Sequence, residues 1–172
     1  MTRSPKQMIE LDVDGEVFEV NVRPHQLLVD VIRDGCGRMS VKEGCETASC
    51  GACTVLIDDI PTLACITLAA DAVGHKICTA ESLSTSDGKL HPLQQAFIDH
   101  HAIQCGFCTP GMLLSGVALV KHTPSPTEDE IRAAIGGNMC RCTGYIRIVR
   151  AIADFAQKAN QGPSSRAKEL VS

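Results

Sequence analysis

The chain is poor in aromatic residues and in positive charge. Its 172 residues include no tryptophan, one tyrosine and four phenylalanines, and its net charge at pH 7 is −4. There is no basic stripe of the kind that binds nucleic acid, and no run reaches the roughly 18 apolar residues of a membrane span. We therefore predict neither nucleic-acid binding nor a membrane-spanning helix.

Motifs for chemistry on an organic substrate are also missing. The chain has no glycine-rich phosphate loop, no dinucleotide fingerprint and no Ser/His/Asp set that can be assembled. Residues 1–16 contain neither the apolar stretch nor the small-residue cleavage site of a secretory signal. We therefore expect a cytoplasmic protein with no substrate-transforming site of its own.

Against this background the chain has ten cysteines. In a reducing cytosol these thiols are poor candidates for five disulfides, and metal binding is the better interpretation. They stand at Cys36, Cys45, Cys50, Cys53, Cys65, Cys78, Cys105, Cys108, Cys140 and Cys142.

The first half of the chain has mostly strand-like patterns. These predict strands over residues 8–13, 16–22, 53–58 and 76–79 and one helix over residues 26–34. Asp14-Gly15 predicts a hairpin turn, Gly35 the end of the helix, and Asp58-Asp59 a second turn. We expect a small sheet crossed by one helix.

The second half has helical patterns. Four helices are predicted, over residues 92–100, 109–121, 127–137 and 143–160. Thr109 is expected to cap the second helix with Pro110 at its first position, and Thr143 to cap the fourth. Thr127 and Glu130 form a capping box before the third.

We therefore predict an α+β chain with two domains, which cover residues 1–84 and 85–162. Ser84 to Lys89 is rich in turn formers and predicts the linker, and residues 163–172 are expected to be a mobile tail.

Eight of the cysteines fall into two sets of four. The first set is C-x4-C-x2-C plus a fourth cysteine after a gap of eleven residues, and C-x4-C-x2-C is the plant-type ferredoxin spacing for a 2Fe–2S cluster. An oxidised cluster with four thiolates is an anion, so it needs hydrogen-bond donors. Small residues such as Gly44 and Gly51 let backbone N–H groups turn towards the sulfurs.

The second set is C-x2-C followed, after a gap of 31 residues, by C-x-C. Cys108 directly precedes the predicted helix start at Thr109, and Cys142 directly precedes Thr143. Helix N-termini favour a nearby anion, and Arg141 adds positive charge. Two helices are therefore expected to point their N-termini at a second cluster.

Other interpretations of the cysteines are open at this point. Structural zinc also uses four thiolates. The spacing of the cysteines favours an iron–sulfur cluster over zinc for the first set, but for the second set it favours neither. A Rieske centre is excluded, because no histidine lies two or three residues after a cysteine. Cys36 and Cys78 are interpreted as small hydrophobic residues, although their role cannot be read from the sequence. His100 and His101 are expected to be solvated.

Three segments together carry a family resemblance. They are GCETASCGACTV (residues 44–55), QCGFCTPGM (residues 104–112) and GGNMCRCTGY (residues 136–145). Over residues 7–160 the chain closely resembles the small iron–sulfur subunit of molybdenum-containing hydroxylases, the xanthine dehydrogenase family. The resemblance implies a ferredoxin-like β-grasp domain followed by a four-helix domain.

The resemblance also implies ligands, cofactors and partners. One 2Fe–2S cluster would be held by Cys45, Cys50, Cys53 and Cys65, and the other by Cys105, Cys108, Cys140 and Cys142. Gln104 would hydrogen-bond the molybdopterin cofactor of a large subunit. Electrons would pass from that site through both clusters to FAD on a medium subunit, in a complex expected to be a dimer of heterotrimers. The substrate is not implied. A stand-alone two-cluster ferredoxin and a zinc-stabilised interaction module are the alternatives.

The chain departs from the family pattern at four positions. Ala48 stands where glycine is frequent, Arg38 and Ser40 stand where an apolar residue and glycine are usual, and Met139 replaces a common leucine. None of the four is an implied ligand, so the departures do not change the ligands that the resemblance implies.

Overall fold

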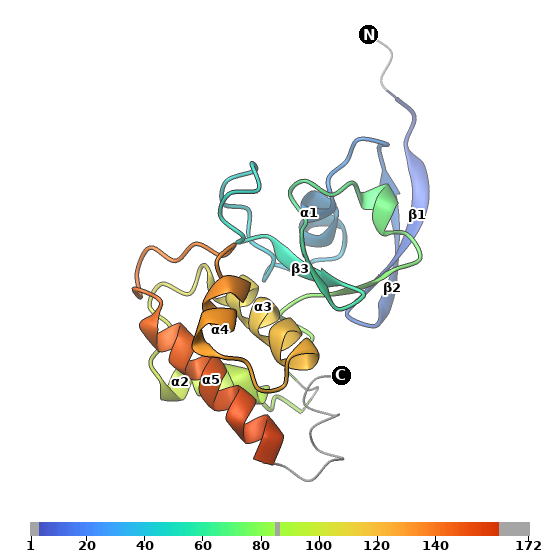
Figure 1. Cartoon of the computed structure of the whole chain (residues 1–172). Helices are drawn as coiled ribbons and strands as arrows, with labels where there is room; N and C mark the ends of the chain where they lie inside the picture. The colour runs from blue at the N-terminus through green and yellow to red at the C-terminus, as the bar shows by residue number, and fades with distance from the viewer. Residues whose placement is uncertain (1–3, 85–86, 162–172) are drawn as a thin grey trace.

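The computed structural model describes residues 4–84 and 87–161, which form a sheet-containing first half and a helical second half (Figure 1). Residues 85 and 86 of the predicted linker and the whole predicted tail, 163–172, lie outside the described residues. The domain boundary at residue 84 therefore stays a prediction. Within the described residues, no helix is long and apolar enough to cross a membrane.

A hairpin opens the sheet, as predicted. β1 (Gln7–Val13) pairs antiparallel with β2 (Glu16–Val22), in a register that places Val13 opposite Glu16. Asp14 and Gly15 make the turn with φ values of 58° and 79°, the left-handed region that such two-residue turns require. Leu11 and Val13 of β1 are fully buried.

The crossing helix is shorter and wider than predicted. α1 (Leu28–Asp30) starts two residues late and continues as the π-helix η1 (Val31–Gly35), so Gly35 does end the helical segment. In this wider turn Cys36 N–H donates to the Val31 carbonyl at 3.0 Å. Leu28 and Ile32 are fully buried against the sheet.

The remaining strands complete a mixed sheet. They are β3 (Thr54–Ile57), β4 (Ile60–Leu63) and, after the 3-10 helix η2 (Ala69–Ala72), β5 (Lys76–Cys78). The strand order is β2-β1-β5-β3-β4, with β5 parallel to β1 and antiparallel to β3. This agrees with the expected β-grasp arrangement. β4 was not predicted, because Pro61 interrupts its strand pattern; an edge strand tolerates proline since one side needs no partner.

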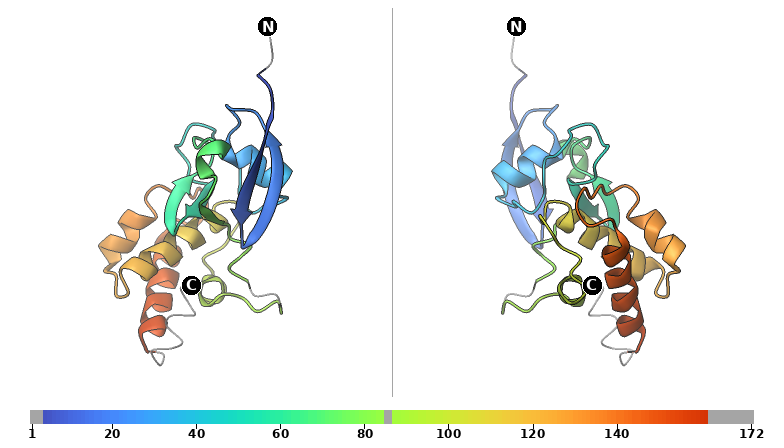
Figure 2. Two further views of the ribbon diagram at one scale, coloured as in Figure 1. Left: turned by 90° about the vertical axis from the view of Figure 1, so that its right-hand side faces the viewer. Right: turned by 90° about the vertical axis from the view of Figure 1, so that its left-hand side faces the viewer.

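In the described part of the second half, helices pack around a core of their own, and Figure 2 shows these helices from two further sides. They are α2 (Pro92–Asp99), α3 (Thr109–His122), α4 (Glu128–Ala134) and α5 (Ile146–Gln161). The Thr127–Glu130 capping box is present at α4. Phe97 and Phe155 are buried where α2 packs against α5.

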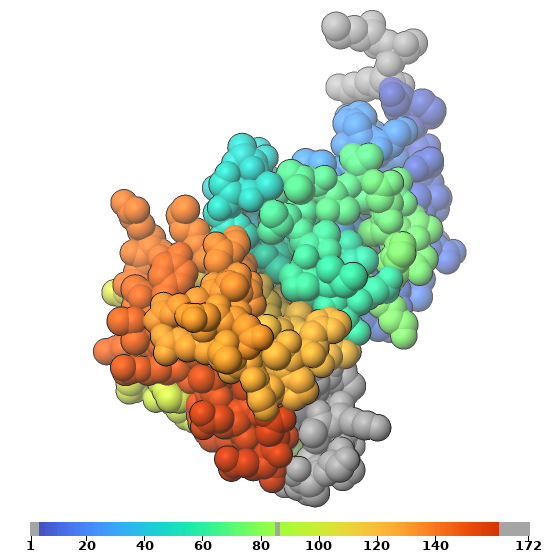
Figure 3. Space-filling model, in the orientation of Figure 1, coloured from blue at the N-terminus to red at the C-terminus, as the bar shows by residue number. Residues whose placement is uncertain are grey.

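The two halves pack directly against each other. α3 contacts β3 and β4, and a small apolar cluster joins Leu56 of β3 to Leu114 and Ala118 of α3. Lys121 on α3 pairs with Asp59 in the β3–β4 turn at 2.8 Å. In Figure 3 the blue-to-green first half and the yellow-to-red second half abut. This packing brings the loop of the first cysteine set close to the loops of the second set.

Candidate metal centres

The β3–β4 hairpin explains the eleven-residue gap in the first cysteine set. Thr54 pairs with Leu63 across the hairpin, and Ala64 N–H donates to the Cys53 carbonyl at 3.3 Å. Cys53, just before β3, therefore lies beside Cys65, just after β4, and both are buried. Burial is the main cause that raises the pKa of the Cys53 thiol to about 12; a backbone hydrogen bond at Cys65 opposes this rise, and contact with the Cys65 thiol adds to it.

The loop before β3 turns backbone donors towards the other two thiols. Thr47 N–H and Ser49 N–H point at Cys45 Sγ from 3.5 and 3.3 Å. Hydrogen bonds from Thr47 N–H, then the Cys50 thiol, the Thr47 hydroxyl and Ser49 N–H, lower the pKa of Cys45 to about 6. Ala52 N–H likewise bonds Cys50, but burial outweighs this and raises the pKa of Cys50. The loop is therefore built to stabilise a thiolate at Cys45.

Each of these donors follows a residue with left-handed backbone. Glu46, Ala48 and Gly51 have φ values of 55°, 61° and 68°, which rotate the next N–H group inward. Gly51 therefore has the predicted conformational role. Gly44 is needed for a different reason: a Cβ there would lie 3.1 Å from Cys50 Sγ and 3.3 Å from Phe107.

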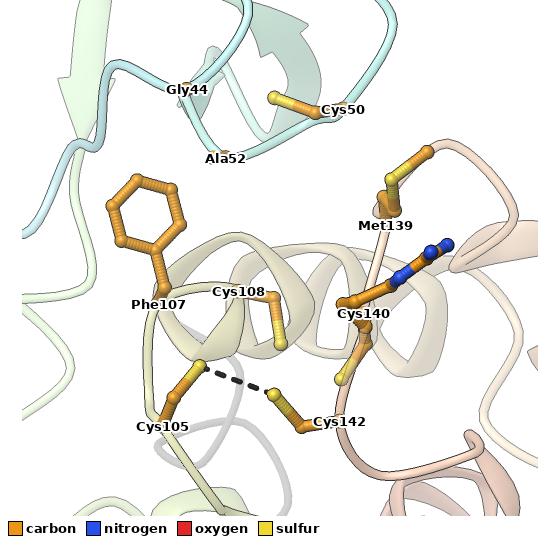
Figure 4. Close-up of a pocket in the computed structure, with 10 residues that line it drawn as sticks. Gly44, Cys50, Ala52, Cys105, Phe107, Cys108, Met139, Cys140 and Cys142 are labelled. Atoms are coloured by element: carbon orange, nitrogen blue, oxygen red, sulfur yellow. Dashed lines mark hydrogen bonds between the residues drawn. The ribbon is translucent and has the colours of Figure 1, made fainter.

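The second cysteine set joins the start of α3 to the loop before α5. Cys108 is the N-cap residue of α3, so Thr109 occupies the first helical position; Thr109 was predicted as the cap, one residue too late. Cys142 Sγ and Cys105 Sγ lie 3.6 Å apart across the gap, as the dashed line in Figure 4 marks. Both thiols are exposed, and contact with Cys105 raises the pKa of Cys142.

The prediction that a helix begins directly after Cys142 is wrong, because α5 begins at Ile146. Thr143 instead serves the thiol loop: its Oγ1 lies 3.0 Å and its N–H 3.5 Å from Cys140 Sγ. Burial raises the pKa of Cys140, but these hydrogen bonds outweigh burial and lower it overall. Among the helices of residues 4–84 and 87–161, α3 alone begins directly after a cysteine of this set.

Tyr145 is a site residue that the sequence analysis missed. Its hydroxyl accepts a hydrogen bond from Cys140 N–H at 2.7 Å, and its own backbone is left-handed, with φ 67°. The sequence signal that could have identified Tyr145 is that a single tyrosine in an aromatic-poor chain stands next to a cysteine pair. Tyr145 holds the C-x-C turn against the helical core.

In each set the four thiols form two contacting pairs. Cys45 contacts Cys50, Cys53 contacts Cys65, Cys105 contacts Cys142 and Cys108 contacts Cys140. Burial, together with the Cys140 contact, raises the pKa of Cys108 to about 12. Within residues 4–84 and 87–161, no three histidine, cysteine or carboxylate side chains converge as a site for a single metal ion.

A cavity of about 300 Å³ lies between the two sets (Figure 4). Cys50 of the first set and all four thiols of the second set line it, together with Phe107, Met139 and Arg141. Phe107 and Met139 are 46% and 57% exposed, so they form its outer rim. The predicted proximity of Arg141 to the second set therefore agrees with the structure.

Gln104 lies at a second cavity, of about 430 Å³, on the outer side of the second set. This cavity is lined by His101, Ile103, Gln104, Cys142, Thr143 and Arg147. Gln104 is exposed, so its amide is available to a molecule that docks over Cys142.

The remaining predicted residues belong to neither set, although His101 lines the same cavity as Cys142. Cys36 is buried in the sheet core and Cys78 packs beside Leu114, and burial raises the pKa of both thiols, in agreement with a hydrophobic role. His101 is exposed as expected. His100 is not merely solvated, because its Nε2 lies 3.2 Å from Asp154 Oδ2 on α5.

Comparison with known proteins assigns each cysteine set to a matched domain. A model described as a 2Fe-2S iron-sulfur cluster binding domain matches residues 14–103, which include the first set. A model described as a 2Fe-2S binding domain matches residues 79–153, which include the second.

Full-length relatives and a solved structure are also similar. The nicotine 6-hydroxylase small subunit of Paenarthrobacter nicotinovorans is 47% identical over 155 residues, or 89% of this chain and 93% of the relative. The nicotinate dehydrogenase small FeS subunit of Eubacterium barkeri is 45% identical over 147 residues, 86% of this chain and 93% of the relative. A chain of quinoline 2-oxidoreductase from Pseudomonas putida 86 matches with a TM-score of 0.87 and 43% identity, over 92% of this chain and 99% of that one.

Proposed function

Because the chain belongs to the family of small iron–sulfur subunits of molybdenum hydroxylases, we propose that it carries electrons from a large subunit to a medium subunit. The large subunit would hold the molybdopterin-type molybdenum cofactor and transform the substrate. The medium subunit would hold FAD, and the complex would be a dimer of heterotrimers. The chain itself is the electron-transfer subunit of an oxidoreductase complex.

The pairing of the thiols supports a specific set of ligands. A structural zinc ion needs four thiolates that converge on one point, whereas a 2Fe–2S cluster has two irons for four thiolates. Two contacting pairs per set fit two irons better than one zinc ion, and this favours iron–sulfur for the second set as well. We assign one cluster to Cys45, Cys50, Cys53 and Cys65 and the other to Cys105, Cys108, Cys140 and Cys142.

The chain supplies hydrogen bonds and positive ends of dipoles around these thiols. A bound 2Fe–2S cluster supplies one-electron redox chemistry, with a potential that depends on hydrogen bonds and exposure. Thr47, Ser49 and Ala52 donate backbone N–H groups at the first set. At the second set, Thr143 N–H points at Cys140 Sγ and the Thr143 hydroxyl lies 3.0 Å from the same sulfur. The N-terminus of α3 adds the positive end of its dipole there. These donors stabilise the thiolate form that ligation requires.

The surface around the second set supports docking of a partner subunit there. Ile103, Phe107, Met139 and Ile146 are between 43% and 57% exposed near Cys105 and Cys142. Apolar side chains gathered on a surface are typical of interaction sites. We propose that the large subunit covers this face and that Gln104 hydrogen-bonds its pterin, with Arg147 at the same cavity.

Metal analysis of the full chain, produced anaerobically with iron, tests the cluster assignment. We expect a red-brown protein with about four iron and four labile sulfide per chain and two paramagnetic signals on reduction. Colourless protein that contains zinc would refute the function. A complex purified with two larger subunits would support the subunit role, whereas a stable red-brown monomer would favour a stand-alone ferredoxin.

The partition of ligands is tested by single substitutions. Cys105→Ser should remove one signal and Cys45→Ser the other, because each residue contacts only thiols of its own set. Cys78→Ser is the matched control, since Cys78 is half-buried in β5 outside both sets. The partition is wrong if Cys45→Ser and Cys105→Ser remove the same signal.

The Gln104 contact is tested in the assembled complex. Gln104→Ala should slow turnover and leave iron content unchanged, because Gln104 is not a thiol ligand. Gln95→Ala is the control, since Gln95 is an exposed glutamine on α2 whose amide bonds Asp99. Unchanged turnover in Gln104→Ala would show that the residue does not touch the pterin. The names of the relatives support nitrogen heterocycles as the first substrates to assay.

A further inference from the structure

A backbone hydrogen bond joins the loops that carry the two cysteine sets. Met139 N–H donates to the Cys50 carbonyl at 2.8 Å. Cys50 belongs to the first set, and Met139 directly precedes Cys140 of the second. A path of covalent bonds interrupted by one hydrogen bond therefore runs from Cys50 to Cys140.

The neighbouring residue, Asn138, holds this contact in place. Asn138 is 4% exposed, and its amide nitrogen and its amide oxygen both have hydrogen-bond partners. Nδ2 donates to the Gly51 carbonyl at 2.9 Å and to Thr54 Oγ1 at 3.1 Å. Oδ1 accepts from Ser115 Oγ at 2.8 Å. Asn138 thus ties the first cysteine loop and β3 to the middle of α3.

The backbones around Asn138 approach so closely that no side chain fits between them. A Cβ on Gly51 would lie 2.3 Å from the Gly137 carbonyl oxygen. A Cβ on Gly111 would lie 2.6 Å from the Gly51 carbonyl oxygen and 2.7 Å from Asn138 Nδ2. Contacts this tight leave little freedom for the two loops to move relative to each other.

We propose that Asn138 is a positioning residue that fixes the separation and orientation of the two clusters, and thereby the electronic contact between them. This inference rests on the proposed function. A buried amide with all partners satisfied defines one arrangement of the groups it joins, because any shift leaves a buried polar atom unpaired. The amide acts through the loops, and no thiol of either set is among its partners.

The test is the magnetic interaction between the two clusters in the full, iron-loaded chain. In the fully reduced wild-type protein we expect splitting of the paramagnetic signals, because dipolar coupling falls with the inverse cube of the separation. Asn138→Ala should lose or reduce this splitting while iron stays at about four per chain. Asn160→Ala is the matched control, since Asn160 bonds Pro124 and Ser125 at the end of α5, and its splitting should be unchanged.

Milder variants keep the proposal falsifiable if Asn138→Ala loses iron. Ser115→Ala and Thr54→Val each remove one partner of the amide and should give an intermediate reduction in splitting. The proposal is overturned if these variants, or an iron-replete Asn138→Ala, keep the wild-type splitting, or if wild type shows two independent signals. Absence of iron from wild type would instead refute the proposed function.

Discussion

Replacement of Gly51 by alanine tests the close contact between the two halves of the chain. Gly51 has φ +68°, and an added Cβ would lie 2.3 Å from the Gly137 carbonyl oxygen and 2.7 Å from Asn138 Nδ2. The carbonyl is backbone and the amide is buried, so neither can swing away. Gly51→Ala therefore meets both a conformational cost and a steric one.

The two costs can be separated with a second glycine. Left-handed backbone costs an L-residue about 1–2 kcal/mol, and overpacking a tight site costs about 1–3 kcal/mol more. We expect Gly51→Ala to lower the free energy of unfolding by about 2–5 kcal/mol. Gly74 has φ +82° with nothing within 4 Å of an added Cβ, so Gly74→Ala should lose only the conformational part, about 1–2 kcal/mol.

Urea unfolding of the two variants, followed anaerobically by far-UV circular dichroism, measures both losses. The difference between them isolates the contact of Gly51 with Gly137 and Asn138, because changes in the unfolded chain are alike for the two substitutions. If the two variants lose the same stability, the loops are not in the contact described, and the structural basis for a fixed spacing fails.

Two further substitutions test the first cysteine loop. Ala48→Gly should raise the thermal midpoint, with a gain of about 0–1 kcal/mol in the free energy of unfolding. The substitution removes the cost of a left-handed alanine, but glycine loses more backbone entropy on folding and offsets part of the gain. A lowered midpoint would contradict this. Arg38→Ala should cost about 1.5–3 kcal/mol in urea unfolding, because Asp14, whose side chain is 7% exposed, loses a charged donor at 2.9 Å. The exposed pair of Arg132 with Glu128 on α4 is the control, and Arg132→Ala should cost about 0.3–0.5 kcal/mol. If Arg38→Ala and Arg132→Ala lose the same stability, Arg38 does not hold the loop in place.

Features set by neighbouring residues could be predicted from the sequence. The Asp14-Gly15 turn and the Thr127–Glu130 capping box depend on chemistry within four residues, and both are present. Arg38, a departure from the family pattern, has a clear place in the structure: it pairs with Asp14 and stacks over Phe18 at 5.1 Å. That place depends on a turn 24 residues away, so no local pattern could indicate it.

Other features depended on distant parts of the chain or on weak signals. The widening of the helix at Val31 needs i→i+5 hydrogen bonds, which have no dependable local signature. Asn138 is polar and stands in a glycine-rich segment, so its burial becomes visible only when Gly51 and Ser115 are brought to it. The cap of α3 was off by one residue, as helix ends commonly are.

The uneven exposure of the thiol pairs has a consequence for handling the isolated chain. Cys105 and Cys142 face solvent, whereas Cys53 and Cys65 are shielded by the sheet. Dioxygen, peroxide and chelators reach an exposed sulfur first, and oxidation of a thiol follows its accessibility. Aerobic bleaching of the subunit without its partners should therefore begin at the edge formed by Cys105 and Cys142, and covering that edge would protect it.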